Sequence, residues 1–444
     1  MVRIWSLFFS GICMLVQVQA QDTLKLNFQE SVKIGLKNNV SLQRENNNLE
    51  VNLANRREAK ALYAPEIGAF MNAQKLNGQQ FDQVTGNVYR DNTDLASVNV
   101  GGRYVVFDGL NRLYSNKQTQ SQLESQKYLV DRTEQDVVFN VGSQFLQLLM
   151  DKEILRINRI NLEAQTTTLE QIRGFVEAGT RSLSDQLDQE ATVSQIEVEV
   201  IRAENNLRID KAIFTQTLLL DPGIEIDAVE PEWSLESLLA QNYDLDDLYN
   251  QAITHRPDYK QALADQEAAS AGINVARALY YPRLEFFGVM GSRYTSLAPD
   301  TDFMEQIFES NYVFNYGLEL SIPIYQRNQV KTQKVIAKMN LENSKLAEKD
   351  LRLMIFREVQ TAHLNFMASK NEYFAATKQF NAAQEAYNIQ KERYEVGVGT
   401  LVELSRSTWT LVDGAASRAQ ARYTLLFQKV ILDYYTGLLN PSNL

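Results

Sequence analysis

The chain contains two copies of one unit, and this duplication constrains its fold more than any other feature of the sequence. The segment ALYAPEI at 61–67 returns 217 positions later as ALYYPRL at 278–284. At almost the same offset, Gly179 corresponds to Gly397, and the polar segment 38–41 corresponds to HRPD at 255–258. A chain with such a repeat is expected to fold as two similar halves.

Proline is distributed so that each copy can hold very long helices. Residues 66–221 and 324–440 contain no proline. The pattern predicts helices over 109–178, 182–220, 326–396 and 400–439, each pair interrupted at a glycine. A helix of about 70 residues is about 105 Å long, which is too long for a globular core. In the last helix, residues at spacings of three, four or seven form the seam of a coiled coil: Leu401, Leu404, Thr408, Leu411, Ala415, Ala419, Leu426 and Val430.

Each copy also contains two strand-like stretches, most of which alternate between apolar and polar residues. The clearest is 311–322, in which the even positions are apolar and the odd ones are mostly polar or small. The same pattern predicts strands near 95–107 and, more weakly, near 66–78. The partner strand near 284–294 has apolar residues on both faces. The sequence therefore predicts four strands, two in each copy.

Two interpretations of these strands remain open from the pattern. Strands of about 10 residues cross a bilayer when tilted, but four strands also suit a soluble sandwich. Four strands are too few to close a barrel, and an open sheet edge cannot lie in lipid. A membrane protein of this kind would therefore need strands from other subunits.

The remaining composition narrows the compartment and the partners. Residues 1–20 have the basic, apolar and small-residue order of a signal peptide, with Cys13 inside the apolar run. A mature chain starting near Gln21 would have no thiol and no lipid anchor, and its formal charge would change from −11 to −12 with the loss of Arg3. This charge argues against nucleic acid as a partner. Residues 221–247 hold nine acidic residues and no basic one, and they predict an acidic linker with a solvated face.

These features divide the chain into four parts: a signal peptide at 1–20, a first repeat at 21–220, the acidic linker at 221–247 and a second repeat at 248–440. Enzymatic patterns are weak. His255 and His363 lie in different repeats, and no zinc spacing, nucleophile elbow or P-loop is present. Asp185 and Asp188 lie one turn apart, as a catalytic acid pair can, but a solvated helix face is the commoner explanation. We therefore expect no enzyme, no cofactor and no metal site.

Two glycine turns between long helices carry a family resemblance. The segment RYEVGVGTLVEL at 393–404 resembles the second periplasmic tip of the TolC-like outer-membrane efflux proteins, and EAGTRSLSD at 177–185 resembles the first. The HRPD helix start at 255–258 and the Tyr281-Pro282 strand start are also typical of that family. The resemblance implies a mainly α protein with a small membrane β-barrel. It also implies a homotrimer with a twelve-stranded barrel in the outer membrane and a twelve-helix tunnel in the periplasm.

The resemblance further implies a passive exit channel that docks onto a periplasmic adaptor and an inner-membrane pump. A type I protein-secretion duct and a structural coiled-coil envelope protein are the alternatives. Residues expected at the docking tips are Gly179, Thr180, Leu183, Gly397, Gly399, Thr400 and Leu401. Residues expected at the entrance constriction are Asp185, Asp188, Tyr394, Glu403 and Arg406.

The second tip departs from the family pattern at two positions. The family commonly has an acid where this chain has Arg406, and a base where it has Gly399. Because Glu403 and Arg406 are three residues apart on one helix, we expect them to be neighbours that can pair. The sequence therefore predicts an entrance without strong cation selectivity, closed by Asp185 and Tyr394 rather than by a tip arginine. Alternatively, Arg406 points to the outer surface.

Overall fold

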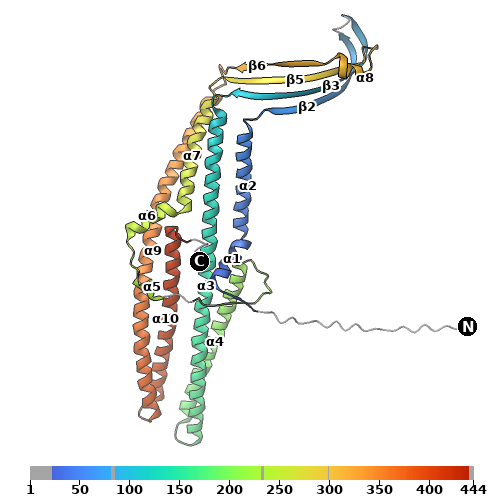
Figure 1. Ribbon diagram of the computed structural model, residues 1–444. Coiled ribbons are helices and arrows are strands. Elements are labelled where there is room, and N and C mark those ends of the chain that lie inside the picture. Colours follow the sequence, from blue (N-terminus) through green and yellow to red (C-terminus); the bar gives the residue numbers. More distant parts are fainter. Residues whose placement is uncertain (1–22, 82–85, 232–234, 299, 440–444) are drawn as a thin grey trace, which may run out of the picture.

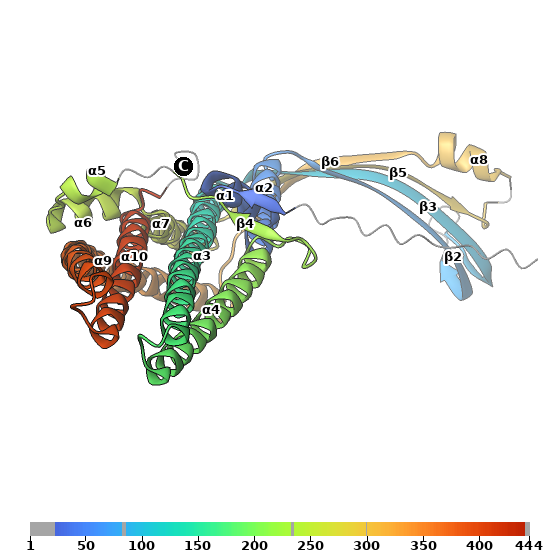
Figure 2. The same cartoon turned by 90° about the horizontal axis from the view of Figure 1, so that it is seen from below.

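A computed structural model describes residues 23–81, 86–231, 235–298 and 300–439; the predicted signal peptide lies outside this range. The long helices form an elongated body with a curved sheet at one end (Figures 1 and 2). The first copy contains β1 (Leu24–Leu26), α1 (Phe28–Asn38), α2 (Val40–Ala61), β2 (Glu66–Phe81), β3 (Val88–Phe107), α3 (Asn111–Glu177) and α4 (Leu183–Thr217).

The second copy follows the same order with three additional elements, α5, α8 and η1. It comprises β4 (Ile226–Ala228), α5 (Leu235–Ala240), α6 (Leu245–His255), α7 (Pro257–Ala278), β5 (Arg283–Thr295), α8 (Phe303–Glu305), η1 (Gln306–Ser310), β6 (Val313–Ser321), α9 (Gln329–Glu395) and α10 (Leu401–Thr436). The break between α1 and α2 falls at Asn39, and that between α6 and α7 falls at Arg256, which are equivalent positions of the repeat.

α3 and α9 begin two and three residues later than the glycine and proline pattern predicted, and α4 and α10 begin one residue later. Gly109 and Leu110 have φ of 67° and 68°, and Arg327 and Asn328 have φ of 49° and 61°. These left-handed pairs turn the chain from strand into helix, so α3 and α9 start at Asn111 and Gln329. A Cβ on Gly109 would lie 2.6 Å from the carbonyl oxygen of Ala278, so a larger residue would clash there.

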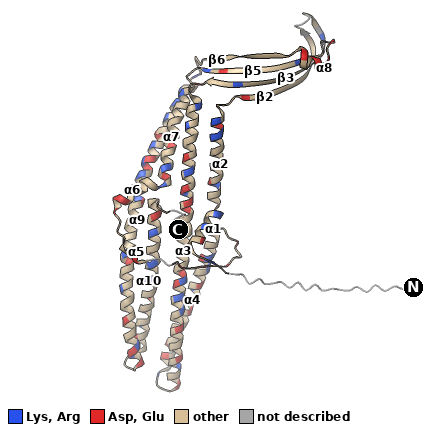
Figure 3. Cartoon of the chain, in the orientation of Figure 1, with Lys and Arg blue, Asp and Glu red and all other residues tan. Residues whose placement is uncertain are grey.

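α3 and α9 contain 67 residues each, which corresponds to about 100 Å. Each forms an antiparallel hairpin with the helix that follows it, and the two hairpins lie side by side at the end opposite the sheet (Figure 1). Charged side chains are spread along these helices and are sparse on the sheet (Figure 3). No helix within the described ranges combines the length and apolarity needed to span a bilayer.

The sheet is antiparallel with the strand order β2-β3-β5-β6. Its register brings the apolar positions of all four strands to one face, where Ile67, Met71, Phe314, Tyr316 and Leu318 are each more than half exposed. β3 starts at Val88 rather than near 95, because its pairing with β2 continues to Phe81. That extension is mostly polar, so apolar alternation could not reveal it.

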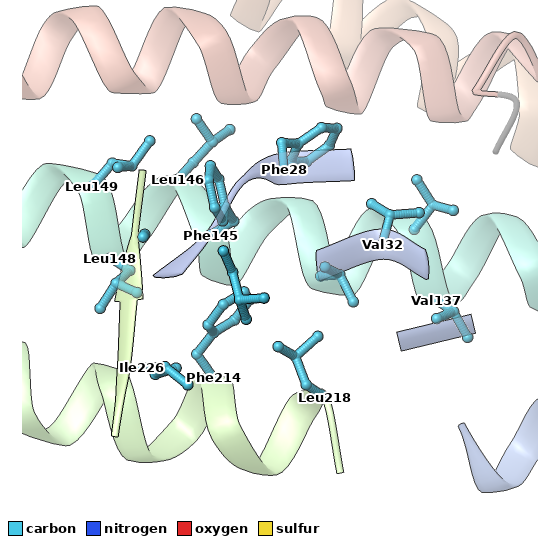
Figure 4. Close-up of a cluster of buried hydrophobic side chains, with 14 of the residues drawn as sticks. Phe28, Val32, Val137, Phe145, Leu146, Leu148, Leu149, Phe214, Leu218 and Ile226 are labelled. Atoms are coloured by element: carbon cyan, nitrogen blue, oxygen red, sulfur yellow. The ribbon is translucent and has the colours of Figure 1, made fainter. Parts of the chain in front are cut away.

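The largest core lies midway along the body and ties the chain's N-terminal elements to the long helices. Phe145 of α3 is fully buried between Phe28 of α1 and Phe214 of α4, with ring centres 5.6 and 6.0 Å away (Figure 4). β1 pairs in parallel with β4 over the same core. Ile226 and Ala228 of β4 are almost fully buried, so this part of the predicted acidic linker also contributes to the core, while Asp221, Glu225 and Glu230 remain exposed.

Candidate functional site

The two hairpin ends are built alike from their local sequence. At the first tip, residues 178–182, Gly179 has φ of 73° and the N–H of Thr180 donates to Phe175 O at 2.9 Å. At the second tip, residues 396–400, Gly397 has φ of 79° and the N–H of Val398 donates to Arg393 O at 2.9 Å. Glycine takes this conformation without strain and so ends each helix.

Each outgoing helix begins with a reciprocal cap. Ser182 accepts from the N–H of Asp185 at 3.2 Å, and the Asp185 carboxylate accepts from the N–H of Ser182. Thr400 and Glu403 repeat this arrangement at the second tip, at 3.3 and 3.1 Å. Side chains that bond to free N–H groups in this way stabilise helix starts. Asp185 and Glu403 therefore have a structural role at the tips.

The Glu403 carboxylate is bonded to backbone rather than to Arg406. The N–H of Thr400 lowers the pKa of Glu403, and the charge of Arg393 adds to this effect. Arg406 is exposed and forms no ion pair within the described ranges. The predicted pairing of Glu403 with Arg406 is therefore wrong for the single chain, because the Glu403 carboxylate bonds to the N–H of Thr400 at the start of α10.

The two tips are joined by an apolar cluster, which we call the tip cluster: Ile172, Tyr394, Leu401 and Leu404. Leu401 was predicted both in the coiled-coil seam and at the docking tip; it is 9% exposed, as a seam residue is, whereas its repeat equivalent Leu183 is 60% exposed. The difference arises because Leu401 packs in the cluster with Ile172 of α3. Leu183 thus remains available as a surface residue and Leu401 does not.

Tyr394 contacts the first tip through a residue that the sequence analysis did not single out. The guanidinium carbon of Arg181 lies 5.1 Å from the ring centre of Tyr394. The Tyr394 hydroxyl is buried and has no hydrogen-bond partner among the described residues. Among the described residues, the predicted cooperation of Asp185 with Tyr394 therefore does not involve a hydrogen bond to the Tyr394 hydroxyl. Arg181 had one signal in the sequence: it occupies, in the first copy, the basic position that Gly399 leaves empty in the second.

The sequence analysis also missed the apolar surface of the second tip. Val396, Val398 and Val402 are 74%, 70% and 76% exposed, and they flank Gly397 and Thr400. The run V-G-V-G at 396–399 was the available signal. Of the other predicted residues, Thr180, Thr400 and Asp188 are exposed and Gly399 is buried.

A groove of about 690 Å³ runs above the tips, between α3 and the α9–α10 hairpin. Its lining includes Ile157 and Ile160 of α3 and Tyr387 of α9. Arg418 of α10 lies in it with its guanidinium carbon 3.7 Å from the ring centre of Phe380. Within the described residues, no group of three or more His, Cys, Asp or Glu side chains is placed to hold a metal ion. The described residues of the hairpin ends thus offer apolar surface and charged side chains.

Comparison with known structures shows the same fold in an outer-membrane channel. The outer membrane channel CmeC of Campylobacter jejuni superposes with a TM-score of 0.77, covering 92% of this chain and 85% of that one, at 15% identity. Such low identity supports the fold alone.

Curated relatives extend the similarity to sequence. The chain is 24% identical to the outer membrane protein TolC of Salmonella enteritidis over 318 residues, or 70% of this chain and 63% of that protein. It is 23% identical to TolC of Escherichia coli over 381 residues, or 82% and 74%. The model of the family described as "Outer membrane efflux protein" matches residues 33–218 and 248–438, one segment in each repeat. This chain therefore belongs to the outer membrane efflux protein family.

Proposed function

We propose that three copies of this chain form a passive exit channel across the outer membrane, in which a twelve-stranded barrel continues into a twelve-helix periplasmic tunnel. The observation that carries this proposal is the open four-stranded sheet. Its edge strands β2 and β6 each have one neighbour among the described residues, and its apolar face is exposed to solvent in the single chain. In lipid, such edges must be paired.

Joining three such sheets edge to edge would pair the open strand edges and would also cover the exposed apolar face with lipid. Pairing β6 of one subunit with β2 of the next gives each edge a partner and closes the sheet. The apolar face then meets lipid. The opposite face carries Arg103, Glu285 and Glu319 and lines the water-filled interior, as is usual for membrane barrels.

At the other end, the tips are the surface that we assign to the periplasmic adaptor of a pump. The exposed residues Thr180, Leu183 and Thr400 lie beside Gly179, Gly397 and Gly399, and the three tip valines extend this surface. The membership of this chain in the outer membrane efflux protein family supports this assignment. By name, TolC is an outer membrane protein and CmeC is an outer membrane channel. Energy for export would come from the pump.

Mass measurement of the detergent-extracted protein tests the assembly. We expect a trimer that dissociates on heating and conducts ions in planar bilayers. A stable monomer would exclude the barrel, since one sheet of four strands cannot close. A trimer without conductance would instead favour a structural envelope protein.

A further inference from the structure

The segment between β5 and β6 is a fixed helical element. α8 and η1 form one continuous segment, Phe303–Ser310, and the buried side chain of Gln306 attaches it to the end of β5. The Gln306 amide nitrogen donates to the carbonyls of Thr295 and Thr301, both at 3.1 Å, and its oxygen accepts from the N–H of Thr295 at 3.0 Å. Asn311 donates to the carbonyl of Arg293 at 2.8 Å.

These hydrogen bonds take the place of the strand pairing that β6 does not provide at the end of β5. β6 begins at Val313, opposite Gly291, so β5 has no β6 partner from Ser292 onward. Gln306 and Asn311 satisfy the backbone groups exposed there. The segment is therefore held in one place on the sheet, and its outward side chains are held with it.

The segment lies against the apolar face of the sheet. Tyr294 and Ser292 share that face with Phe286 and Met290, because alternate residues of a strand point the same way. The Phe303 ring centre is 5.1 Å from that of Tyr294, and Ser292 donates to Gln306 O at 3.1 Å. Figures 1 and 2 place α8 at the end of the sheet farthest from the helices.

The height of this contact matches a membrane boundary. From Leu284 to Tyr294, ten residue steps at about 3.3 Å and a tilt of about 40° rise about 25 Å, which is the height of the apolar band of outer-membrane barrels. Tyr294 and Phe303 then fall where the band ends. Aromatic side chains are enriched at such boundaries.

The segment is amphipathic. Phe303, Met304 and Phe308 are 47%, 61% and 73% exposed, and helical spacing places them on one side. The acids Asp302, Glu305 and Glu309 fall on the other. Helices of this kind lie in the plane of a lipid interface with the apolar side buried.

We propose that Phe303–Ser310 is an interfacial anchor that inserts Met304 and Phe308 into the outer leaflet of the outer membrane and keeps Glu305 and Glu309 in water. This inference rests on the proposed barrel. The first copy joins β2 to β3 through residues 82–87, which is too short for an eight-residue helix. Three anchors per channel would fix its depth and tilt.

Site-directed spin labelling can test the anchor in the full mature chain. Because the only cysteine is Cys13, inside the predicted signal peptide, each introduced cysteine carries a unique label. Met304→Cys and Phe308→Cys are the test variants, Glu309→Cys is the matched control and Phe314→Cys on β6 reports the barrel. The trimer is reconstituted in phosphatidylethanolamine–phosphatidylglycerol vesicles, and the collision rates of each label with oxygen and with a water-soluble nickel chelate are measured.

We expect labels at 304, 308 and 314 to show a several-fold higher ratio of oxygen to nickel collisions than the label at 309. Nickel accessibility at 304 and 308 equal to that at 309 would overturn the anchor. Protection of both from oxygen and nickel would also overturn it, since a neighbouring subunit would then cover the segment. In either case a lipid-facing label at 314 leaves the barrel intact, whereas a nickel-accessible label at 314 rejects the barrel itself.

Discussion

Arg181 of the first tip lies over the ring of Tyr394 of the second hairpin, 5.1 Å from guanidinium carbon to ring centre. The two residues come from different copies of the repeat, and the equivalent of Arg181 in the second copy is Gly399. The second copy therefore has no arginine at that position with which to form the equivalent contact to the first hairpin. It joins the two hairpins at the end that we assign to the channel entrance.

Arg181→Gln should loosen this end of the channel. A cation–π contact near the surface contributes about 0.5–1 kcal/mol, so its loss should raise the open population about two- to fivefold. Single-channel recording measures this as higher mean conductance. Tyr394→Phe is the control, because it keeps the ring and removes a hydroxyl that has no partner in the chain. An equal effect of both substitutions would show that the hydroxyl, not the cation, holds the entrance.

Gly399→Val should disrupt the second tip without dissociating the trimer. A Cβ at this position would lie 3.0 Å from Tyr394 N and 3.2 Å from Arg393 C, so the turn must shift. We expect export of a pump substrate to fail in cells while trimers persist in outer-membrane fractions. Gly174→Ala in α3 is the control, because its Cβ would meet open space. Normal export by the Gly399→Val trimer would remove this turn from the docking surface.

Arg406→Asp should shift the channel toward cation selectivity. Because the Glu403 carboxylate is bonded to the N–H of Thr400 and forms no direct ion pair with Arg406, the three Arg406 side chains would place positive charge at the entrance and weaken cation preference. Two unit charges about 8 Å apart at an effective dielectric of about 20 interact by about 2 kcal/mol, enough to alter ion preference. Reversal potentials in a salt gradient provide the measurement. Strong cation selectivity in the natural protein that the substitution leaves unchanged would place Arg406 outside the pore.

Asp151→Asn should make stability less dependent on pH. Burial between α3 and α4, with a hydrogen bond and the negative charge of Asp210, raises the pKa of Asp151 to about 7. The folded chain therefore keeps a proton that the unfolded chain releases above about pH 4, and the contribution of Asp151 to stability falls as pH rises from about 4 through 7.

Thermal unfolding between pH 4 and pH 8 tests this. The Asn variant should come near the wild type at about pH 4 and exceed it by a margin that grows up to about pH 7. Asp188→Asn, at an exposed position of α4, should leave the pH profile unchanged. A parallel shift of the whole profile by Asp151→Asn would mean that the titration of Asp151 is not responsible.

Arg256→Met should destabilise the body strongly. The Arg256 side chain is 1% exposed and donates to Asp258 at 2.6 Å and to Glu358 at 2.7 Å. Removing one partner of a buried pair typically costs about 3–5 kcal/mol, because the remaining charges are left without compensation. Arg202→Met removes the exposed pair with Glu199 and should cost less than about 1 kcal/mol. Chemical denaturation of the trimer compares the two, and similar costs would contradict a structural role for the buried network.

Local sequence patterns predicted where the two tips lie in the chain, but they did not predict which residues contact one another there. The glycines, which the sequence analysis identified, act through backbone conformation, and the Ser182 and Thr400 caps, which it did not identify, bond to neighbouring N–H groups. The coiled-coil spacing of the last helix already placed Leu401 on a packed seam, but no local pattern predicted that its repeat equivalent Leu183 is exposed. The two residues occupy equivalent positions of the repeat and differ only in what the rest of the chain places beside them.

The helical segment at Phe303–Ser310 and the role of 226–228 were likewise invisible in the sequence. From the sequence, Gln306 is an ordinary polar residue. Its role appears only in the fold, where β5 extends beyond the pairing with β6 and Gln306 binds the backbone of Thr295. Acidic composition suggested a solvated linker, yet two apolar residues in it complete the central core with β1. In both places a few side chains contact groups that lie outside their own local segment, and no local sequence pattern predicts such contacts.

The sequence by itself determined the duplication, the long helices and the alternating strands, because periodicity and glycine or proline placement act within a few residues. Tertiary structure decided which tip residues are buried, that Glu403 bonds to Thr400 rather than Arg406, and that Arg181 meets Tyr394. These outcomes depend on competition among partners brought together from both repeats, and the free energies that separate such partners are set by packing and desolvation in the folded chain.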